Sequence, residues 1–378
     1  MRSFACRAAL AFFVAIVSLA GPGAALERTD LSASAACDPT VDTMDALSKA
    51  ALNDPFEPPK INGQPIEVDL GIFLQDLSQV VDATQTFEAE AFAEVTWCDP
   101  RWAFDETALG TDHEVYHDSL ARDRHREKWW PDLQFINITS LPSVLQEEFT
   151  VWSDGTVVQR VRLNGTLRSA FDFSKFPFDQ QDLQFHVQAF SSDIEDVQLV
   201  IQEEKTGYAE DSILPYWRIT GSWARVDEVM TIRQEVPFSQ MTLNLHAERF
   251  SAPYVYRLLL PLVLIVIASW SVFWLRPTST GRFGVTFTTI LTIVTFNFYV
   301  SRQLPEVQGL TYIEMVYQFS FSFLLLVVLE NLIVERSTAK GQAERAQYVD
   351  EVSRFFFPFI YFVGLLAITW QFGIFDGV

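Results

Sequence analysis

The chain has 378 residues, 49% of them hydrophobic, and a formal net charge of −21. Its 48 acidic residues against 27 basic ones would repel a nucleic-acid backbone, which argues against a DNA or RNA partner. The five histidines are scattered, the three cysteines show no CxxC spacing, and no nucleophile–base pair or phosphate-binding loop is recognisable. The sequence therefore predicts no enzyme and no cofactor.

The N-terminus has the order of a secretory signal. Arg2 and Arg7 flank the start of an apolar run, residues 8–20, and small residues lead to a cleavage position after Ala25. The alternative, a first membrane span, requires about 20 apolar residues, and this run is shorter. Cys6 would leave with the signal. Cys37 and Cys98 would then lie in an oxidising compartment, as one disulfide or as two free thiols.

From Ile66 onward apolar and polar residues alternate with a period of two, which is typical of half-buried strands. The clearest runs are residues 88–97, 156–163, 182–190 and 241–247. Turns are predicted at Asp154-Gly155, Asn164-Gly165 and Pro177. Many short strands at this spacing indicate a β-sandwich. A short helix at residues 40–51 and a proline-rich segment at 55–65 are expected to precede it.

The last third of the chain contains four apolar segments suited to crossing a bilayer. They are residues 258–275, 283–301, 315–329 (extendable to 334) and 355–372. If the N-terminal domain is exported, four spans return the C-terminus to the outside. The two connectors that would then be cytoplasmic follow the positive-inside rule, although Arg302 would lie outside. Their basic residues are Arg276, Arg282, Arg336, Lys340, Arg345 and Arg354.

Three motifs, in order, carry a resemblance to a known family. The sequence WCDPR at 97–101 resembles the Trp-x-Asp-x-Arg motif of Cys-loop receptors, and WWPD at 129–132 resembles their Trp-x-Pro-Asp motif. FPFDQQ at 176–181 resembles the Phe-Pro-Phe-Asp-x-Gln of their signature loop. Arg249 before the first span and Pro261 within it also fit. Residues 66–372 thus resemble a prokaryotic pentameric ligand-gated ion channel.

The signature loop departs from the animal pattern. Animal members close this loop with two cysteines, and the corresponding residues here are Ser169 and Leu183. Prokaryotic relatives also lack the bridge. Phe176 and Phe178 can each contribute ~1.5–3 kcal/mol by burial, so packing is expected to hold the loop. Five residues of the first two motifs are interpreted as structural: Trp97, Asp99, Arg101, Trp129 and Asp132.

The resemblance implies an agonist site between subunits, in a cage of aromatic side chains. The matching positions are Phe92, Ile136, Phe190 and Phe238, of which Ile136 departs from the aromatic pattern. Such a cage suits cationic amines through cation–π attraction of ~0.5–2 kcal/mol per ring. For each residue, packing in the sandwich core is the alternative.

A second candidate site is acidic. Glu203, Glu204, Glu210 and Asp211 flank a loop between strands. Carboxylates on such a loop can bind Ca²⁺, which would then modulate the channel. A solvated acidic face is the alternative interpretation.

The second span carries a candidate pore lining in one helical stripe. Its members follow one another in steps of four and three residues: Gly284, Thr288, Leu291, Thr295, Phe298 and Arg302. Five such helices would form a polar inner pore below an apolar collar, and apolar rings gate by dewetting. Leu291 is therefore the expected principal gate, a position at which the family also has a leucine, and Phe298 a second constriction. The alternative, threonines bonded to their own backbone, leaves Arg302 unexplained.

Gating must pass between the sandwich and the membrane helices. The resemblance places Asp82, Asp179, Arg249 and Pro305 in this layer. We expect Asp82 or Asp179 to pair with Arg249 and to act on the linker 303–311, which contains Pro305. A static structural pair is the alternative.

Ion selectivity is argued from charge. Gly281 precedes Arg282, so the glutamate of cation-selective relatives is missing, and Thr280-Gly281 also lacks the Pro-Ala pair of anion-selective ones. Arg302 would form a positive outer ring that opposes cations. Residues 26–251, however, hold 40 acidic and 17 basic residues, a net charge near −23 that should concentrate cations. A cation-preferring channel is predicted, with an anion channel as the alternative.

These inferences combine into an extracellular all-β immunoglobulin-like sandwich followed by a four-helix transmembrane bundle. The expected domains are a signal peptide (1–25), an N-terminal helix and linker (26–65), a ligand-binding sandwich (66–251) and a pore domain (252–378). We expect a homopentamer in a bacterial inner membrane, with a small-molecule or ion agonist, permeant inorganic ions and lipid as partners. A non-conducting membrane receptor and a membrane enzyme are the rival hypotheses.

Overall fold

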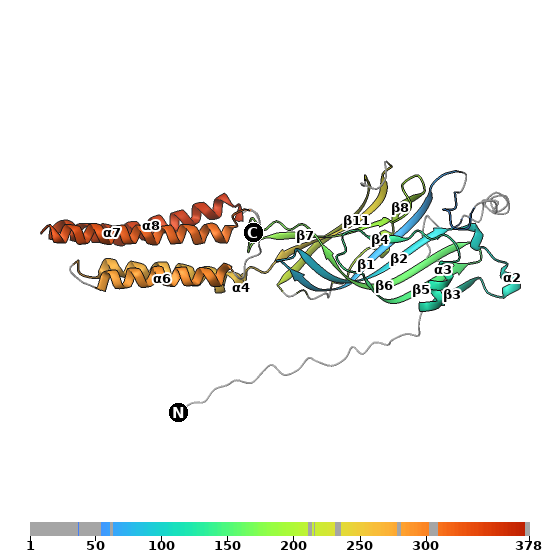
Figure 1. The fold of residues 1–378 in the computed structure, drawn as a ribbon, viewed down its shortest axis with the longest axis horizontal. Helices are drawn as coiled ribbons and strands as arrows, with labels where there is room; N and C mark the ends of the chain where they lie inside the picture. Colours follow the sequence, from blue (N-terminus) through green and yellow to red (C-terminus); the bar gives the residue numbers. More distant parts are fainter. Residues whose placement is uncertain are drawn as a thin grey trace, which may run out of the picture. The chain divides into compact units, whose positions relative to one another are not determined.

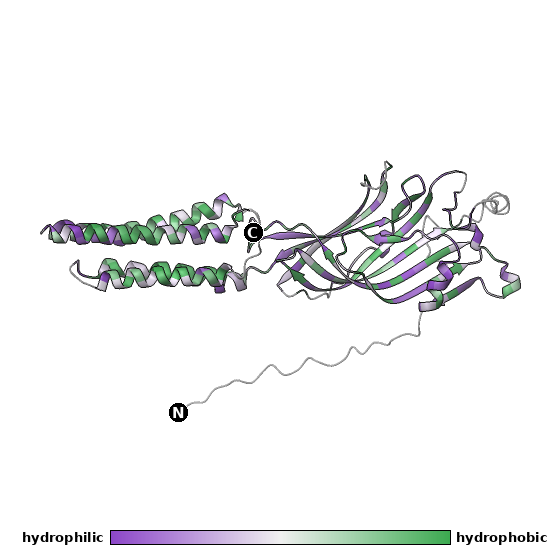
Figure 2. Ribbon diagram, in the orientation of Figure 1, coloured by the Kyte–Doolittle hydropathy of each residue, from purple (hydrophilic) through white to green (hydrophobic). Residues whose placement is uncertain are grey.

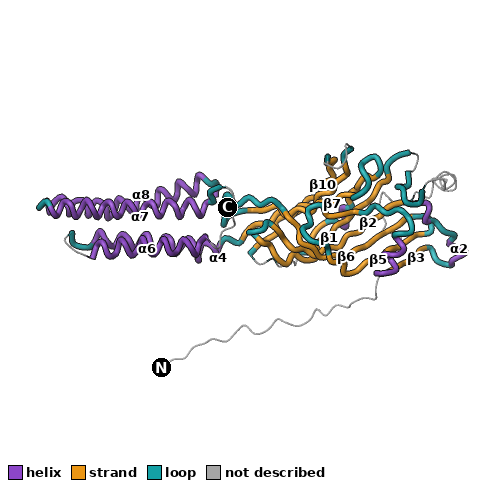
Figure 3. Tube along the Cα trace, viewed as in Figure 1, coloured by secondary structure: helices purple, strands orange, loops and turns teal. Residues whose placement is uncertain are grey.

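The computed structural model describes residues 37, 54–60, 63–210, 214, 216–230, 236–277, 281–301 and 309–374. Strands occupy the chain from Ile66 to Arg249, and long helices follow from Ala252 to Gln371 (Figures 1 and 3). This confirms the predicted β-sandwich followed by four membrane helices. The predicted signal peptide and the helix at 40–51 lie outside the described residues.

Two sheets make up the sandwich. The seven-stranded sheet has the order β3-β5-β6-β2-β1-β8, with β9 paired to β1, and the four-stranded sheet has the order β10-β11-β7-β4. The strands of the first are β1 (Ile66–Val81), β2 (Thr86–Cys98), β3 (His113–His117), β5 (Ser143–Trp152), β6 (Thr156–Arg168), β8 (Val197–Ile201) and β9 (Gly207–Tyr208). Those of the second are β4 (Leu133–Phe135), β7 (Gln180–Ala189), β10 (Trp217–Val229) and β11 (Phe238–Arg249). Two short helices, α2 (Glu106–Leu109) and α3 (Asp118–His125), precede β4.

The core of the sandwich lies between the inward faces of the two sheets. Along β7 every second side chain is buried, as at Leu183, Phe185 and Val187, because successive residues of a strand point to opposite faces. The ring of Phe185 meets that of Phe87 on β2 edge to face, at 5.1 Å between centroids. The same alternation of polar and apolar residues is visible along the strands in Figure 2.

The predicted turn at Asn164-Gly165 is wrong. Both residues lie inside β6, where Asn164 pairs with Glu90 and Gly165 with Ala89 of β2. The glycine has a close neighbour instead: a Cβ at this position would lie 2.8 Å from Cδ1 of Ile138, so that side chain would have to shift. A glycine in a strand here permits close approach of a neighbouring side chain rather than a reversal of the chain.

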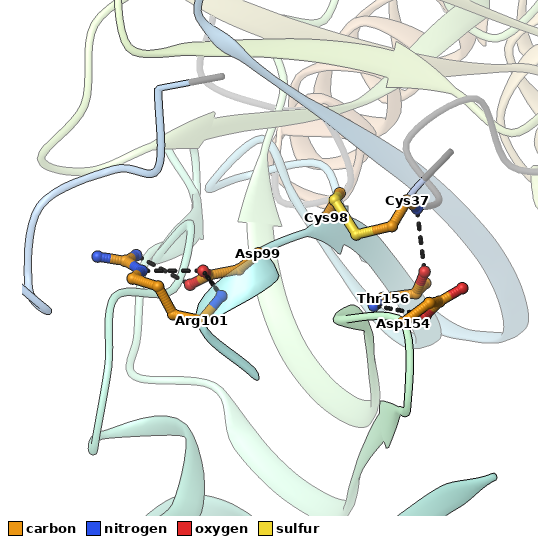
Figure 4. Close-up of a disulfide and its surroundings, with 6 residues drawn as sticks. All are labelled: Cys37, Cys98, Asp99, Arg101, Asp154 and Thr156. Atoms are coloured by element: carbon orange, nitrogen blue, oxygen red, sulfur yellow. Dashed lines mark hydrogen bonds and ion pairs between the residues drawn. A yellow bond between two sulfur atoms is a disulfide. The ribbon is translucent and has the colours of Figure 1, made fainter. Parts of the chain in front are cut away.

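Cys37 and Cys98 form a disulfide (Figure 4). Of the two alternatives that the sequence left open, a bridge and two free thiols, the structure has the bridge. The amide of Cys37 also donates to Thr156 Oγ1 at 3.0 Å, at the start of β6. Beside the bridge, the buried Asp99 carboxylate accepts from Nε and Nη2 of Arg101, both at 2.8 Å. These contacts agree with a structural role for the first motif.

Among the described residues, four helices are long and apolar enough to cross a membrane: Ala252–Trp274, Gly281–Ser301, Tyr312–Ala339 and Ala343–Gln371. The first is built from α4 (Ala252–Tyr254), a π-helical turn (Val255–Leu259), α5 (Leu260–Ser269) and a 3₁₀ turn (Trp270–Trp274). The others are α6 (Gly281–Ser301), α7 (Tyr312–Ala339) and α8 (Ala343–Gln371).

Two helices extend beyond their predicted apolar segments. Glu314, which directly precedes the predicted third span, lies in the first turn of α7. Its carboxylate accepts from the amide of Thr311 at 2.9 Å, while Thr311 Oγ1 accepts from the Glu314 amide at 3.3 Å, which is a capping box. The polar connector before the fourth span is mostly helical, since α8 already begins at Ala343.

Candidate functional site

Arg249 gathers two carboxylates at the end of β11. Its Nε and Nη2 donate to the two oxygens of Asp179 at 2.8 and 3.0 Å. Its Nη1 and Nη2 donate to the two oxygens of Asp82 at 2.7 and 3.0 Å. The side chains of Arg249 and Asp179 are each 1% exposed, and that of Asp82 is 23% exposed. The predicted pairing with Asp82 or Asp179 is thus confirmed for both acids.

Aromatic rings complete the surroundings of Arg249, and the sequence analysis missed them. The guanidinium carbon lies 4.1 Å from the ring centroid of Trp217 and 4.9 Å from that of Phe176. Burial alone would lower the pKa of Arg249, but the hydrogen bonds and charges of Asp82 and Asp179 outweigh it and hold that pKa above its usual value. The site therefore holds a charged guanidinium between two carboxylates, of which Asp179 is buried and Asp82 reaches solvent.

The signature loop, between β6 and β7, contacts the membrane helices. Ser174 O accepts from the amide of Tyr312, the first residue of α7, at 2.9 Å. The ring of Phe178 meets that of Tyr312 at 5.7 Å, and the ring of Phe176 meets that of Tyr254 in α4 at 5.0 Å. The loop that carries Asp179 thus touches the starts of the first and third spans. Pro305 lies outside the described residues.

Hydrogen bonds as well as packing hold the signature loop where animal relatives have a disulfide. Ser169 Oγ accepts from the amide of Gln184 at 2.8 Å. The Gln181 side chain accepts from the Asp172 amide at 2.9 Å and donates to Asp179 Oδ2 at 2.6 Å. Phe176 is fully buried, as the packing argument required.

The predicted ligand residues separate into two faces. Ile136, after β4, and Phe190, after β7, belong to the four-stranded sheet and are 43% and 46% exposed. Phe92, on β2 of the other sheet, is 40% exposed. Phe238 is 1% exposed, because β11 begins there and turns its ring into the core, so it offers no open face to a ligand.

Two polar neighbours of these residues were not identified from the sequence. The Arg162 guanidinium lies 5.4 Å from the Phe92 ring centroid and pairs with Glu90 at 2.5 Å. His186 O accepts from the Ile136 amide at 2.8 Å, and burial, together with the charge of Arg225, lowers the pKa of the imidazole. Only folding brings these partners from distant strands, so no local sequence signal marks them.

The acidic cluster is partly described. Glu203 and Glu204 begin a 3₁₀ turn (Glu203–Lys205), and both are exposed, as is Glu210. Within the described ranges no group of three or more His, Cys, Asp or Glu side chains is arranged to hold a metal ion. Asp211 lies outside those ranges, and the calcium site stays a prediction.

Helix α6 presents the predicted stripe on its exposed side. Leu291 is 67% and Phe298 69% exposed, and Gly284, Thr288 and Thr295 are exposed as well. Its opposite side is buried against α5 and α7 and contains Thr286, Thr289, Ile293 and Val300. Thr288 Oγ1 donates to Gly284 O at 2.7 Å and Thr295 Oγ1 to Leu291 O at 2.9 Å, so their hydroxyl oxygens remain to accept from water. Arg302 lies outside the described residues.

Comparison with known proteins agrees with this arrangement. The family model of the neurotransmitter-gated ion-channel ligand binding domain matches residues 42–250, and that of the neurotransmitter-gated ion-channel transmembrane region matches residues 258–348. A proton-gated ion channel of Gloeobacter violaceus is 26% identical over 83% of this chain and 86% of its own length.

Animal receptors are similar over a smaller share of their length. The gamma-aminobutyric acid receptor subunit theta of Mus musculus is 24% identical over 73% of this chain and 43% of its own length. The glycine receptor subunit beta of Homo sapiens is 24% identical over 71% of this chain and 55% of its own length. Together with the two-sheet sandwich and the four membrane helices, these matches show that the chain belongs to the pentameric ligand-gated ion channels, the neurotransmitter-gated ion-channel family, whose members are channels and not enzymes.

Proposed function

We propose that the chain is a subunit of a homopentameric, cation-preferring ligand-gated channel in a bacterial inner membrane. The observation that carries this proposal is the exposed stripe of α6. Leu291 and Phe298 lie in line with Gly284 and the two threonines, on the side of the helix that its own chain leaves uncovered. A stripe on a membrane helix that combines threonine hydroxyls with apolar side chains is suited to a water-filled channel that apolar rings can close.

Cation preference is supported by the charge of the outer domain. Residues 26–251 carry a net charge near −23, and five copies around one axis would raise the local cation concentration at the pore entrance. The positive ring expected at Arg302 opposes this effect, but its reach in physiological salt is limited to a Debye length of ~8 Å. An anion-selective channel is the alternative.

The reversal potential tests conduction and selectivity in one experiment. The full chain, reconstituted into a bilayer under a sodium chloride gradient, is expected to pass current with a reversal potential near the sodium equilibrium value. A value near that of chloride would replace the cation channel by the anion channel. Assembled protein without current under acid steps or a panel of small amines would favour the non-conducting receptor.

The agonist site is proposed between Ile136 and Phe190 of one subunit and Phe92 of its neighbour. Each of these three side chains is exposed in the single chain, and the two faces belong to different sheets. The Arg162 guanidinium already lies over the Phe92 ring, so a cationic agonist would have to bind beside it. The name of the Gloeobacter relative suggests a proton as the other possible stimulus.

Alanine at Phe190 should raise the half-activating concentration of an amine agonist about 2–30-fold, because one cation–π contact contributes ~0.5–2 kcal/mol. Phe92→Ala should raise it within the same range, since the Phe92 ring lies on the other side of the proposed site. Dose–response curves with the activating amine, or with pH steps, check both. Leu120→Ala, which truncates a 64% exposed side chain on α3, serves as the control. Unchanged curves for both phenylalanine variants would remove the site from this interface.

A further inference from the structure

The first basic residue of α6 is directed into the protein and engages every donor it has. Arg282 is 3% exposed, and its Nε donates to Asn331 Oδ1 at 3.0 Å. Its Nη1 donates to Leu275 O at 3.1 Å and to Asp350 Oδ2 at 2.9 Å. Its Nη2 donates to Asp350 Oδ1 at 2.7 Å and to Glu330 Oε2 at 3.4 Å. A guanidinium has five N–H donors in a fixed fork, and all five are used here.

The partners of Arg282 come from α7, from α8 and from the residue that follows the first span. Leu275 follows the first span, Glu330 and Asn331 lie on α7, and Asp350 lies on α8. Asn331 also donates to Thr286 Oγ1 at 2.7 Å, one turn further along α6, which fixes the rotation of that helix about its axis. Because this burial is complete within one chain, assembly with other subunits can only increase it.

Two carboxyl groups face the single positive charge of the Arg282 guanidinium. Asp350 forms a two-pronged ion pair with Arg282, and its side chain is 3% exposed. Glu330 contributes a second carboxyl, 4% exposed, at a longer distance. Bidentate arginine–carboxylate pairs combine strong attraction with a defined orientation, so they hold the guanidinium in one direction.

Resting on the proposed pore lining by α6, we propose that Asp350 is a positioning residue for ion selectivity. It holds Arg282 away from the pore, so that five copies of this arginine form no positive ring at the inner mouth. A ring of exposed basic side chains at a pore constriction favours anions, whereas a desolvated ion pair presents little net charge. A cation-preferring pore can therefore begin with an arginine.

Asp350→Asn is expected to raise the chloride-to-sodium permeability ratio several-fold, measured as a shift of the reversal potential toward chloride in a sodium chloride gradient. The amide keeps an acceptor but not the charge that holds the guanidinium. Adding Arg282→Gln in the double variant should return the reversal potential to the wild-type value. The matched control is Glu351→Gln, which removes the same formal charge from the next, exposed residue of α8. It should leave selectivity unchanged.

A wild-type reversal potential in an Asp350→Asn channel that still conducts would overturn the inference, as would a shift of equal size in Glu351→Gln. If Asp350→Asn does not assemble, thiol accessibility tests whether residue 282 faces away from the pore. A charged methanethiosulfonate applied to open channels should modify Thr288→Cys and leave Arg282→Cys unmodified, and equal rates at the two positions would place residue 282 in the pore. Absence of wild-type current, by contrast, would refute the proposed function itself.

Discussion

Asp179→Asn should raise the stimulus needed for half-activation by about tenfold or more. Breaking a buried ion pair from one side costs ~3–5 kcal/mol, and ~1.4 kcal/mol suffices for a tenfold change in an equilibrium. Asp179 and Arg249 are each 1% exposed, and the loop of Asp179 touches the starts of α4 and α7. Loss of this pair should therefore weaken the connection between the sandwich and the pore helices.

A double-mutant cycle separates coupling from simple destabilisation. Asp179→Asn, Arg249→Gln and the double variant are compared by dose–response curves, and by the mass of the solubilised assembly. We expect a coupling free energy of ~0.5–3 kcal/mol in gating, and a smaller one for Asp82, whose side chain is 23% exposed. Asp182→Asn, an exposed acid of the same loop-to-strand region, is the matched control. Additive effects on gating would mean that Asp179 and Arg249 form a static structural pair that is not coupled to gating.

The strands could be predicted because their signal is local. Alternation over ten residues is enough to identify β7 or β11, and it does not depend on what each strand pairs with. The turn predicted at Asn164-Gly165 is wrong because the role of this glycine depends on a distant part of the chain. The residue that packs closely against Gly165 is Ile138, which only the folded chain brings against β6. Asn-Gly, a dipeptide typical of hairpins, thus lies within a strand, where its glycine packs against a distant segment of the chain.

The same distinction governs the candidate site. Arg249 could be assigned acidic partners from the motifs around it, but not both at once, because the sequence does not show that one guanidinium can reach two loops. Phe238 was expected in the ligand cage, and its register opposite Val229 buries it instead. The sequence marks Arg282 as a basic residue of a cytoplasmic connector and as the residue that opens the second span, but it does not show where the side chain points. Its partner Asp350 is 68 residues away along the chain, at a distance where sequence patterns give no information.

The second large effect is expected for a substitution at Leu291, in the exposed stripe of α6. Five leucines around a narrow pore exclude water when the channel is closed, and a hydroxyl in their place provides a partner for water. Leu291→Thr replaces a γ-branched side chain by a shorter, β-branched one that carries a hydroxyl. Leu291 lies on an exposed side of the helix, so the helix packing against α5 and α7 should survive. We therefore expect a standing current without stimulus and a half-activating stimulus lowered by about tenfold, corresponding to ~1.4 kcal/mol toward the open state.

Currents recorded before and after the stimulus, in bilayers with equal amounts of assembled protein, measure both effects of Leu291→Thr. The same substitution at Leu329, which is 53% exposed on α7, tests whether a threonine on any uncovered membrane surface is sufficient. Leu329 belongs to a helix outside the proposed pore lining, so its variant should activate like the wild type. Phe298→Thr, two turns further along the stripe, should show the leak in weaker form if a second apolar ring contributes to the barrier. A Leu291→Thr channel with no leak and wild-type activation would show that the Leu291 ring is not the gate. Comparison of the leak in the three variants would then show whether the barrier lies at Phe298 instead.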